Sequence, residues 1–192
     1  MPKLPEINIQ LLQFLIVDDD QHIRDTVVDV LRHFGCKNVR EAEDGDAALK
    51  MLDMYQPDVI LTEFELPKTS GIELTFRIRR SAIGTVRMTP IIILSAHTRE
   101  GQVMRARDVG ATEYLAKPIR ASTIYARISS VIVEPRTFIE SDGFVGPDRR
   151  RKHDPFLVGQ ARRKADEEAE QMMTEDVSGD ITEDEIDAML GL

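Results

Sequence analysis

Cysteine and long apolar runs are nearly absent from this chain of 192 residues. The single cysteine, Cys36, excludes an intramolecular disulfide and suits a reducing compartment. No stretch approaches the roughly 20 apolar residues that a membrane-spanning helix needs, and residues 1–5 lack the apolar region of a signal peptide. We therefore expect a cytoplasmic protein without a membrane partner.

Charge of both signs is present but unevenly placed. The net charge of −9 divides near Pro135 into −2 for residues 1–134 and −7 for residues 135–192, and no Lys or Arg follows Lys164. Such segregated blocks usually stay solvated or pair with a partner of opposite charge. The acidic tail also lacks a helix-turn-helix pattern, so we expect no DNA partner.

Short apolar runs alternate with amphipathic stretches in the first 134 residues, which predicts an α/β fold. Five runs have the length and content of buried parallel strands. They are Leu11 to Val17, Val39 to Ala42, Val59 to Thr62, Ile91 to Leu94 and Tyr114 to Ala116. Helical spacing predicts helices over about 23–34, 47–52, 71–80, 99–109 and 120–133. This (βα)5 order predicts a doubly wound parallel five-stranded sheet, with a ligand site outside the carboxyl ends of the strands.

Chemistry-bearing residues follow the predicted strands at that edge. Asp18 and Asp19 end the first strand, Glu63 the third, Ser95 the fourth and Lys117 the fifth. Crowded carboxylates repel one another unless a hard cation binds among them, and Mg2+ prefers oxygen ligands. Each motif alone has an ordinary alternative, namely loop solubility or a helix cap, and Asp20 is the expected cap of the first helix.

The joint pattern resembles a response-regulator receiver domain of the CheY-like kind over about residues 10–134. It rests on the order of the motifs and on the spacings from Asp19 to Glu63 and from Ser95 to Lys117. The resemblance implies a flavodoxin-like receiver fold and a Mg2+ site made by Asp18, Asp19, Glu63 and the backbone carbonyl of Glu65. It also implies that Lys117 pairs with the carboxylate or phosphoryl group and that Ser95 donates its hydroxyl to a phosphoryl oxygen.

Glu63 departs from this family, which carries an aspartate at the position that accepts phosphate. Its carboxylate stands one methylene further out, about 1.5 Å, and misplacement on that scale can cost about a hundredfold in rate. We expect poor phosphotransfer and a glutamate that imitates the phosphorylated state. Whether Glu63 is natural or engineered stays open, although the otherwise complete site favours an engineered or allelic change.

The resemblance also implies a switch. In this family, phosphorylation draws the hydroxyl at the Ser95 position inward and lets an aromatic on the fifth strand, here Tyr114, turn into the vacated space. The output surface is then built from the fourth helix, the fifth strand and the fifth helix. Taken alone, Tyr114 is an ordinary half-buried strand residue. The expected partners are a histidine kinase or phosphotransfer protein and a protein output target.

The end of the chain carries a second pattern, over residues 181–190. Thr182 and Glu185 form a capping box, Ile181 and Ile186 fit a hydrophobic staple, and Ile186, Met189 and Leu190 share one helical face. The segment is similar to the N-terminal peptide of the flagellar switch protein, which docks on CheY-type receivers. We predict docking of this peptide on the chain's own receiver, in cis or in a homodimer, or competition with the peptide of a partner such as the flagellar motor switch. The ordinary alternative is a surface helix that closes the chain.

The sequence thus divides into four segments. Residues 1–9 form an N-terminal extension, 10–134 the receiver, 135–159 a linker with the basic cluster Arg149 to Lys152, and 160–192 an acidic, partly helical tail. The basic cluster could bind an anionic nucleotide, but the known dinucleotide motif needs an arginine where His153 stands. A solvated linker, or one paired with the acidic run, is the simpler interpretation.

We interpret the chain as a response regulator, not an enzyme, that acts by phosphorylation-controlled protein binding in motility or a related pathway. The alternative is a constitutive adaptor or second-messenger-binding receiver that acts through its tail. An aspartyl phosphatase needs Asp-x-Asp-x-Thr at the first strand, and His22 holds the threonine position.

Overall fold

The computed structural model describes residues 7–141, 144–148 and 181–190. Its core is a parallel five-stranded sheet in the order β2-β1-β3-β4-β5. The strands are β1 Gln13–Val17, β2 Asn38–Ala42, β3 Val59–Glu63, β4 Ile91–Ser95 and β5 Glu113–Ala116. The order reverses at β1, which pairs with both β2 and β3. This confirms the predicted doubly wound fold. The strand order reverses between β1 and β3, so the ligand site expected of such a fold lies outside the carboxyl ends of these two strands.

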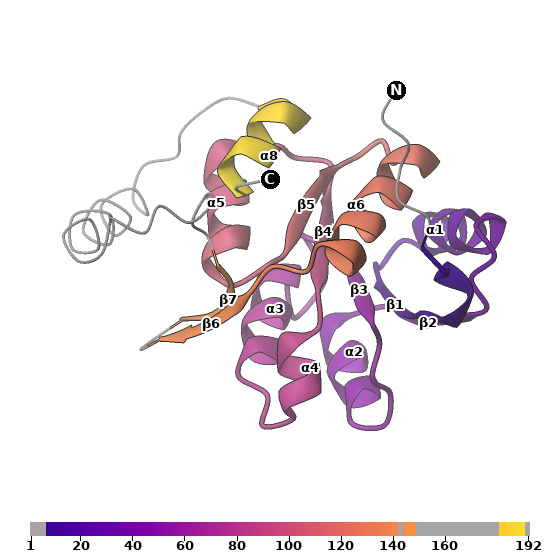
Figure 1. Ribbon diagram of the computed structural model, residues 1–192, viewed down its shortest axis with the longest axis horizontal. Helices are drawn as coiled ribbons and strands as arrows, with labels where there is room; N and C mark the ends of the chain where they lie inside the picture. The colour runs from indigo at the N-terminus through magenta and orange to yellow at the C-terminus, as the bar shows by residue number, and fades with distance from the viewer. Residues whose placement is uncertain (1–6, 142–143, 149–180, 191–192) are drawn as a thin grey trace.

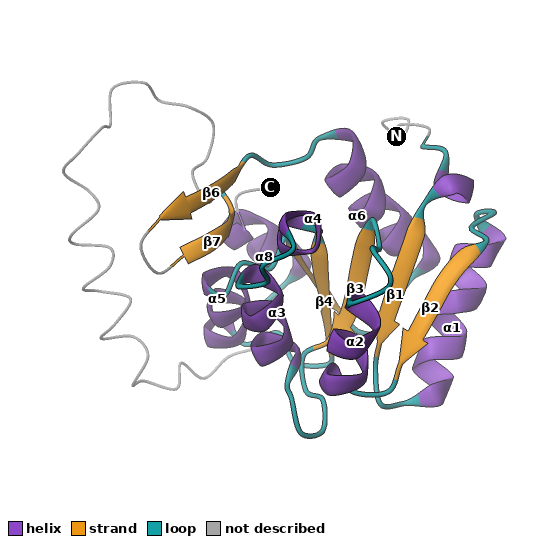
Figure 2. Ribbon diagram, turned by 90° about the horizontal axis from the view of Figure 1, so that it is seen from below, coloured by secondary structure: helices purple, strands orange, loops and turns teal. Residues whose placement is uncertain are grey.

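Helices connect successive strands and cover both faces of the sheet (Figures 1 and 2). They are α1 Gln21–His33, α2 Gly45–Leu52, α3 Gly71–Arg79, α4 Gly84–Met88, α5 Glu100–Asp108 and α6 Ala121–Val133. Residues of β1 alternate between two hydrophobic clusters: Leu15 and Val17 pack with α2, α3 and α5, whereas Phe14 and Ile16 pack with α1 and α6. Among the described residues, no helix is long and apolar enough to cross a membrane.

Helix ends follow the predicted capping chemistry. Asp20 Oδ1 accepts a hydrogen bond from the backbone N–H of His22 at 2.8 Å, which confirms it as the cap of α1. Strand β1 begins two residues later than predicted, because Leu11 lies in a 3-10 helix (η1, Ile9–Leu11) and is 73% exposed. Helix α4 was not predicted.

A two-stranded antiparallel hairpin occupies part of the range that we predicted as a linker. Its strands are β6 Phe138–Ser141 and β7 Phe144–Pro147. The guanidinium of Arg79 lies 5.0 Å from the ring centroid of Phe138, and Arg87 Nη1 lies 3.2 Å from Glu140 Oε1. The segment after α6 therefore folds back onto α3 and α4.

Arg79 is the buried anchor of this region. It is 1% exposed and donates hydrogen bonds to the carbonyl oxygens of Gly110, Arg87 and Thr89 at 2.8–2.9 Å. Burial lowers the pKa of Arg79 to about 9. Its side chain ties the end of α3 to the segments that precede β4 and β5.

The last described element is α8, Glu183–Leu190, which lies beside α5 and β5 (Figure 1). The predicted capping box is present, because the Thr182 N–H donates to Glu185 Oε2 at 2.7 Å and the Glu185 N–H donates to Thr182 Oγ1 at 3.3 Å. The basic cluster at 149–152, His153, residues 160–180 and 191–192 of the acidic tail and residues 1–6 of the N-terminal extension lie outside the described residues.

Candidate functional site

Four strands bring polar side chains to one edge of the sheet. Asp18 follows β1, Glu63 ends β3, Ser95 ends β4 and Lys117 follows β5. Asp18, Glu63 and Ser95 are 1%, 8% and 0% exposed. Buried polar groups need partners, so the contacts among these residues define what the site can do.

Lys117 joins the two buried carboxylates. Its Nζ lies 3.0 Å from Asp18 Oδ2 and forms an ion pair with Glu63 Oε2. Burial opposes the charge on Lys117, but the hydrogen bonds to Glu63 and Asp18 outweigh it, and the net effect raises the pKa of Lys117. The lysine is therefore held as a cation between two anions.

The second oxygen of Glu63 is bound by backbone amides. Oε1 accepts hydrogen bonds from the N–H of Phe64 at 2.7 Å and from the N–H of Glu65 at 3.2 Å. Hydrogen bonds to an ionised acceptor are among the stronger ones in proteins. The Glu63 carboxylate thus fills a ready-made anion site formed by two amides and one ammonium group.

Gly71 makes the backbone of this site possible. It begins α3, and its N–H donates to the Phe64 carbonyl oxygen at 3.0 Å. A Cβ atom at position 71 would lie 2.0 Å from the Glu63 carbonyl oxygen, which no side chain tolerates. The turn that carries Glu63 therefore requires glycine here.

Arg24 is a site residue that the sequence interpretation missed. It lies on α1, is 8% exposed, donates to the Asp18 carbonyl oxygen at 2.6 Å and approaches Glu41 at 3.5 Å. The Asp18 carboxylate is further fixed by the Asp20 N–H, which donates to Oδ1 at 2.9 Å. The local sequence of α1 gives no signal that this arginine turns inward.

The predicted metal ligands do not form a closed cluster of side chains in the described residues. Asp18 is buried, whereas Asp19 and Glu65 are exposed at the same edge. Within the part of the chain that the structure describes, no three His, Cys, Asp or Glu side chains gather closely enough to hold a metal ion. Mg2+ commonly binds through one or two carboxylates and keeps several waters, so the oxygen donors of this edge fit such an ion without a third side chain.

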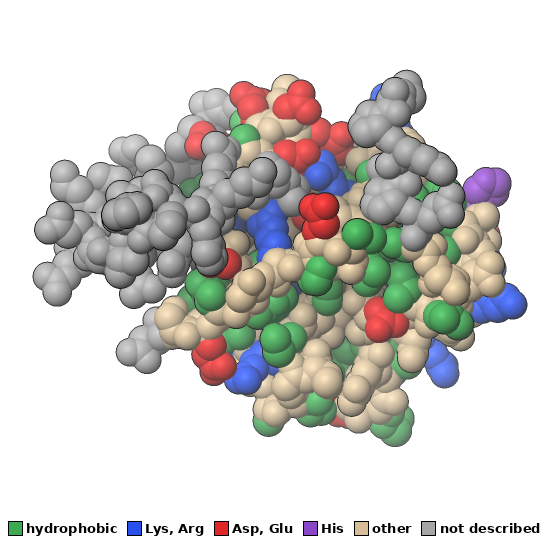
Figure 3. Space-filling view, viewed as in Figure 1, with side chains coloured by type: hydrophobic (Ala, Val, Ile, Leu, Met, Phe, Trp, Pro, Cys, Tyr) green, Lys and Arg blue, Asp and Glu red, His purple; other side chains and the backbone are tan. Residues whose placement is uncertain are grey.

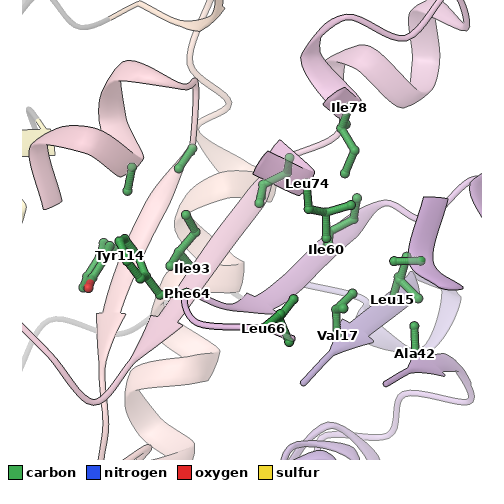
Figure 4. Packing of buried hydrophobic residues seen from close by; sticks show 14 of the residues in the cluster. Leu15, Val17, Ala42, Ile60, Phe64, Leu66, Leu74, Ile78, Ile93 and Tyr114 are labelled. Atoms are coloured by element: carbon green, nitrogen blue, oxygen red, sulfur yellow. The ribbon is translucent and has the colours of Figure 1, made fainter. Parts of the chain in front are cut away.

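Ser95 and Tyr114 meet at the loop that follows β4. Ser95 Oγ accepts a hydrogen bond from the His97 N–H at 3.1 Å, and the Tyr114 hydroxyl donates to the His97 carbonyl oxygen at 2.6 Å. Tyr114 is fully buried, and its ring centroid lies 6.2 Å from that of Phe64 (Figure 4). Burial raises the pKa of Tyr114 to about 12, although a hydrogen bond with Ser95 opposes this shift.

The predicted docking peptide lies on the face that carries Tyr114. Ile186 and Leu190 are 0% and 1% exposed and join the hydrophobic cluster that contains Tyr114, whereas Ile181 and Met189 are partly buried against it. Because α4 is an additional helix, the predicted surface of fourth helix, fifth strand and fifth helix corresponds to α5, β5 and α6. The loop after β4 connects this segment to the edge of the sheet that carries Glu63, because the Ile181 N–H donates to the Thr98 carbonyl oxygen.

Comparison with known proteins assigns residues 14–129 to a family. A model of the response regulator receiver domain matches residues 14–129. The transcriptional regulatory protein PdtaR of Mycobacterium tuberculosis is 31% identical over 148 residues, which cover 77% of this chain and 70% of that protein. The chemotaxis protein CheY-3 of Vibrio cholerae is 32% identical over 120 residues, 62% of this chain and 91% of that protein. The structure of the chemotaxis response regulator CheY4 of Vibrio cholerae, 30% identical, aligns with a TM-score of 0.58 and covers 62% of this chain and 98% of that one.

Proposed function

This chain belongs to the response regulator receiver family, and we propose that its Glu63 carboxylate takes the place of a phosphoryl group and holds the receiver in its signalling conformation. The chain is a two-component response regulator receiver, and proteins of this kind interact with histidine kinases or phosphotransfer proteins and with output targets. Glu63 stands at the position where the family carries its phosphoacceptor.

The observation that carries the proposal is the set of donors around Glu63. Lys117 Nζ and the N–H groups of Phe64 and Glu65 bind its two oxygens. A phosphoryl group is also an anion that needs fixed positive donors, and charge-assisted hydrogen bonds of this kind are strong. With these donors engaged, the longer side chain places its single negative charge about 1.5 Å nearer to where a phosphoryl group would stand.

The position of Tyr114 supports the same proposal. Its ring is fully buried and its hydroxyl binds the carbonyl of His97 instead of solvent. In this family an inward aromatic accompanies the phosphorylated state. Ser95 Oγ accepts from the His97 N–H, no described contact joins it to Glu63, and donation of its hydroxyl to a phosphoryl oxygen stays a prediction.

Mg2+ is the cofactor that we propose for this edge. Asp18, Asp19 and the backbone carbonyl of Glu65 would hold it, and it would neutralise the charge of the phosphoryl oxygens during transfer. Glu63 would become a further Mg2+ ligand only if its carboxylate left Lys117, because its two oxygens are bound by Lys117 and by the Phe64 N–H.

The output that we propose is protein binding. Similarity to CheY-3, a chemotaxis protein, favours a motility or related pathway, and the flagellar motor switch is one candidate target. A second function, a phosphate-independent adaptor, is favoured by one observation: the donors around Glu63 are already satisfied without phosphate.

Phosphorylation of a Glu63→Asp protein separates the two functions. We expect Glu63→Asp to gain one phosphoryl group from a small phosphodonor in the presence of Mg2+, as read by intact mass, because the shorter acceptor restores the alignment. The starting protein and a Glu63→Asn control should gain none. Failure of Glu63→Asp to accept phosphate, with its fold intact, would favour the adaptor.

A further inference from the structure

Helix α8 occupies the α5–β5–α6 face through a small apolar contact. Ile186 and Leu190, one helical turn apart, are buried in the cluster that also holds Val103 of α5 and Tyr114 of β5. The receiver therefore buries the two large aliphatic residues of α8, and Met189 is partly buried beside them. The first turn of this helix, Glu183 to Glu185, is exposed and acidic.

Arginines from three segments surround this contact. Arg127 Nη2 on α6 lies 2.5 Å from Asp187 Oδ1, Arg107 on α5 donates to the Met189 carbonyl oxygen at 3.4 Å, and Arg136 donates to the Leu190 carbonyl oxygen. The last two bonds satisfy carbonyls that an isolated helix leaves free at its C-terminal end.

Charge complements this arrangement. The first turn of α8 carries Glu183, Asp184 and Glu185, and Figure 3 shows acidic side chains over α8 with basic ones next to them. The face thus recognises two apolar residues at a spacing of i and i+4 on an acidic helix. Any peptide with that chemistry would use the same contacts.

Helix formation in this segment depends on docking. Eight residues are too few for a stable isolated helix, even with the capping box of Thr182 and Glu185. Since α8 and the face belong to one chain, docking is intramolecular, and the covalent connection raises the effective concentration of α8 at this face. A competing peptide therefore has to overcome a high local concentration of α8.

The loop after β4 links the docked helix to Glu63's edge of the sheet. Ser95 accepts from the N–H of His97, Tyr114 donates to the carbonyl of His97, and the next carbonyl, that of Thr98, accepts from the N–H of Ile181 at 2.7 Å. Three hydrogen bonds thus run from the end of β4 to the start of the α8 segment. A shift of this loop changes both ends at once.

We propose that α8 is an intramolecular ligand that closes the α5–β5–α6 face and must leave before an acidic amphipathic helix of another protein can bind there. The proposal rests on the proposed function only for the identity of this face as the output surface. Occupation of the face by the chain's own helix is expected whether the protein signals through phosphate or acts as a phosphate-independent adaptor. The partner is defined by its chemistry: an acidic helix with large aliphatic residues at i and i+4.

A labelled peptide of residues 178–192 tests the proposal on the full chain by fluorescence anisotropy. Ile186→Ala/Leu190→Ala in the chain removes the apolar anchors of α8, and Leu11→Ala/Met54→Ala, two exposed apolar residues outside the α5–β5–α6 face, is the matched control. We expect the anchor variant to bind the peptide at least tenfold more tightly than the unchanged chain and than the control. A peptide that itself carries Ile186→Ala/Leu190→Ala should not bind.

A second measurement guards against a folding defect in the anchor variant. Amide NMR signals of α5 and β5 should shift in that variant while those of α1 and β2 stay in place. Equal peptide affinity of the unchanged chain and the anchor variant, or binding to neither, would overturn the proposal. A dimer that dissociates in the anchor variant would also overturn it, because docking would then be between chains. No phosphodonor is used, so the outcome is independent of the Glu63→Asp experiment.

Discussion

Glu113 on β5 should make the stability of this protein fall as pH rises through neutrality. The carboxylate is 1% exposed and lies below α8, at 3.8 Å from Arg127 and 3.9 Å from Arg136. Both ion pairs are long, and Glu113 Oε2 has no hydrogen-bond partner within the described residues. Burial therefore outweighs the two arginines and, with Asp187 nearby, raises the pKa of Glu113 from 4.5 to about 7.

The direction of the effect follows from proton linkage. The folded chain binds the Glu113 proton more tightly than the unfolded chain, so this contribution to stability is complete below about pH 4.5 and is lost as pH rises through about 7. The full difference corresponds to about 3 kcal/mol, of which about 2 kcal/mol falls between about pH 5.5 and pH 8. Glu113→Gln removes the titrating group and keeps the shape of the side chain.

Urea unfolding followed by far-UV circular dichroism measures this effect, and it suits a chain without tryptophan. The stability of the unchanged chain relative to Glu113→Gln should drop by about 2 kcal/mol between about pH 5.5 and pH 8. The two proteins differ only at position 113, so the difference between them reports Glu113. A difference that does not vary with pH would refute the reasoning, since it would mean that Glu113 is ionised throughout.

Three substitutions test the remaining contacts by urea unfolding or hydrogen exchange. Lys117→Met leaves two buried carboxylates without a cation and should cost about 3 kcal/mol, partly restored by adding Glu63→Gln; a loss below about 1 kcal/mol would contradict the ion pairing. Gly71→Ala should cost at least about 2 kcal/mol because its Cβ would meet a carbonyl oxygen, whereas Gly84→Ala, with open space around it, should be near neutral, and similar costs at both would speak against the steric argument. Tyr114→Phe loses the hydrogen bond to the loop after β4, should cost about 1 kcal/mol and should speed amide exchange in α8; unchanged exchange there would count against coupling through this loop.

The central sheet could be predicted because its strands are short, apolar and buried on both faces. Runs such as Val59 to Thr62 and Ile91 to Leu94 carry that signal without help from the rest of the chain. Helix α4 carries none, since Val86 is its one buried residue and five residues show no period. The β6–β7 hairpin was hidden for another reason: Gly143, Gly146 and Pro147 are typical of a linker when their tertiary partners are unknown.

The part of the site that lies at strand ends could be predicted from the sequence, because the carboxyl ends of parallel strands meet at one edge of the sheet. Asp18, Glu63 and Lys117 were named as neighbours and do lie in contact. Arg24 was not named, because nothing local distinguishes an arginine that turns inward from one that faces solvent. The bond between the Ser95 oxygen and the His97 N–H was also missed, since it depends on the path of a loop and not on residue type.

The close approach of two glycines determines how α5 can move. A Cβ atom on Gly110 would lie 2.5 Å from the Val145 carbonyl oxygen, and one on Gly146 would lie 2.8 Å from the Gly110 Cα, so the hairpin backbone presses directly on the turn that ends α5. This contact holds the Asp108 end of α5 against the hairpin. The other end, at Glu100, lies at the edge of the sheet that carries Glu63. Because the hairpin holds the Asp108 end of α5, we expect a displacement that starts at the edge of the sheet carrying Glu63 to move the Glu100 end of α5 more than the hairpin end, and with it the contact between α5 and α8.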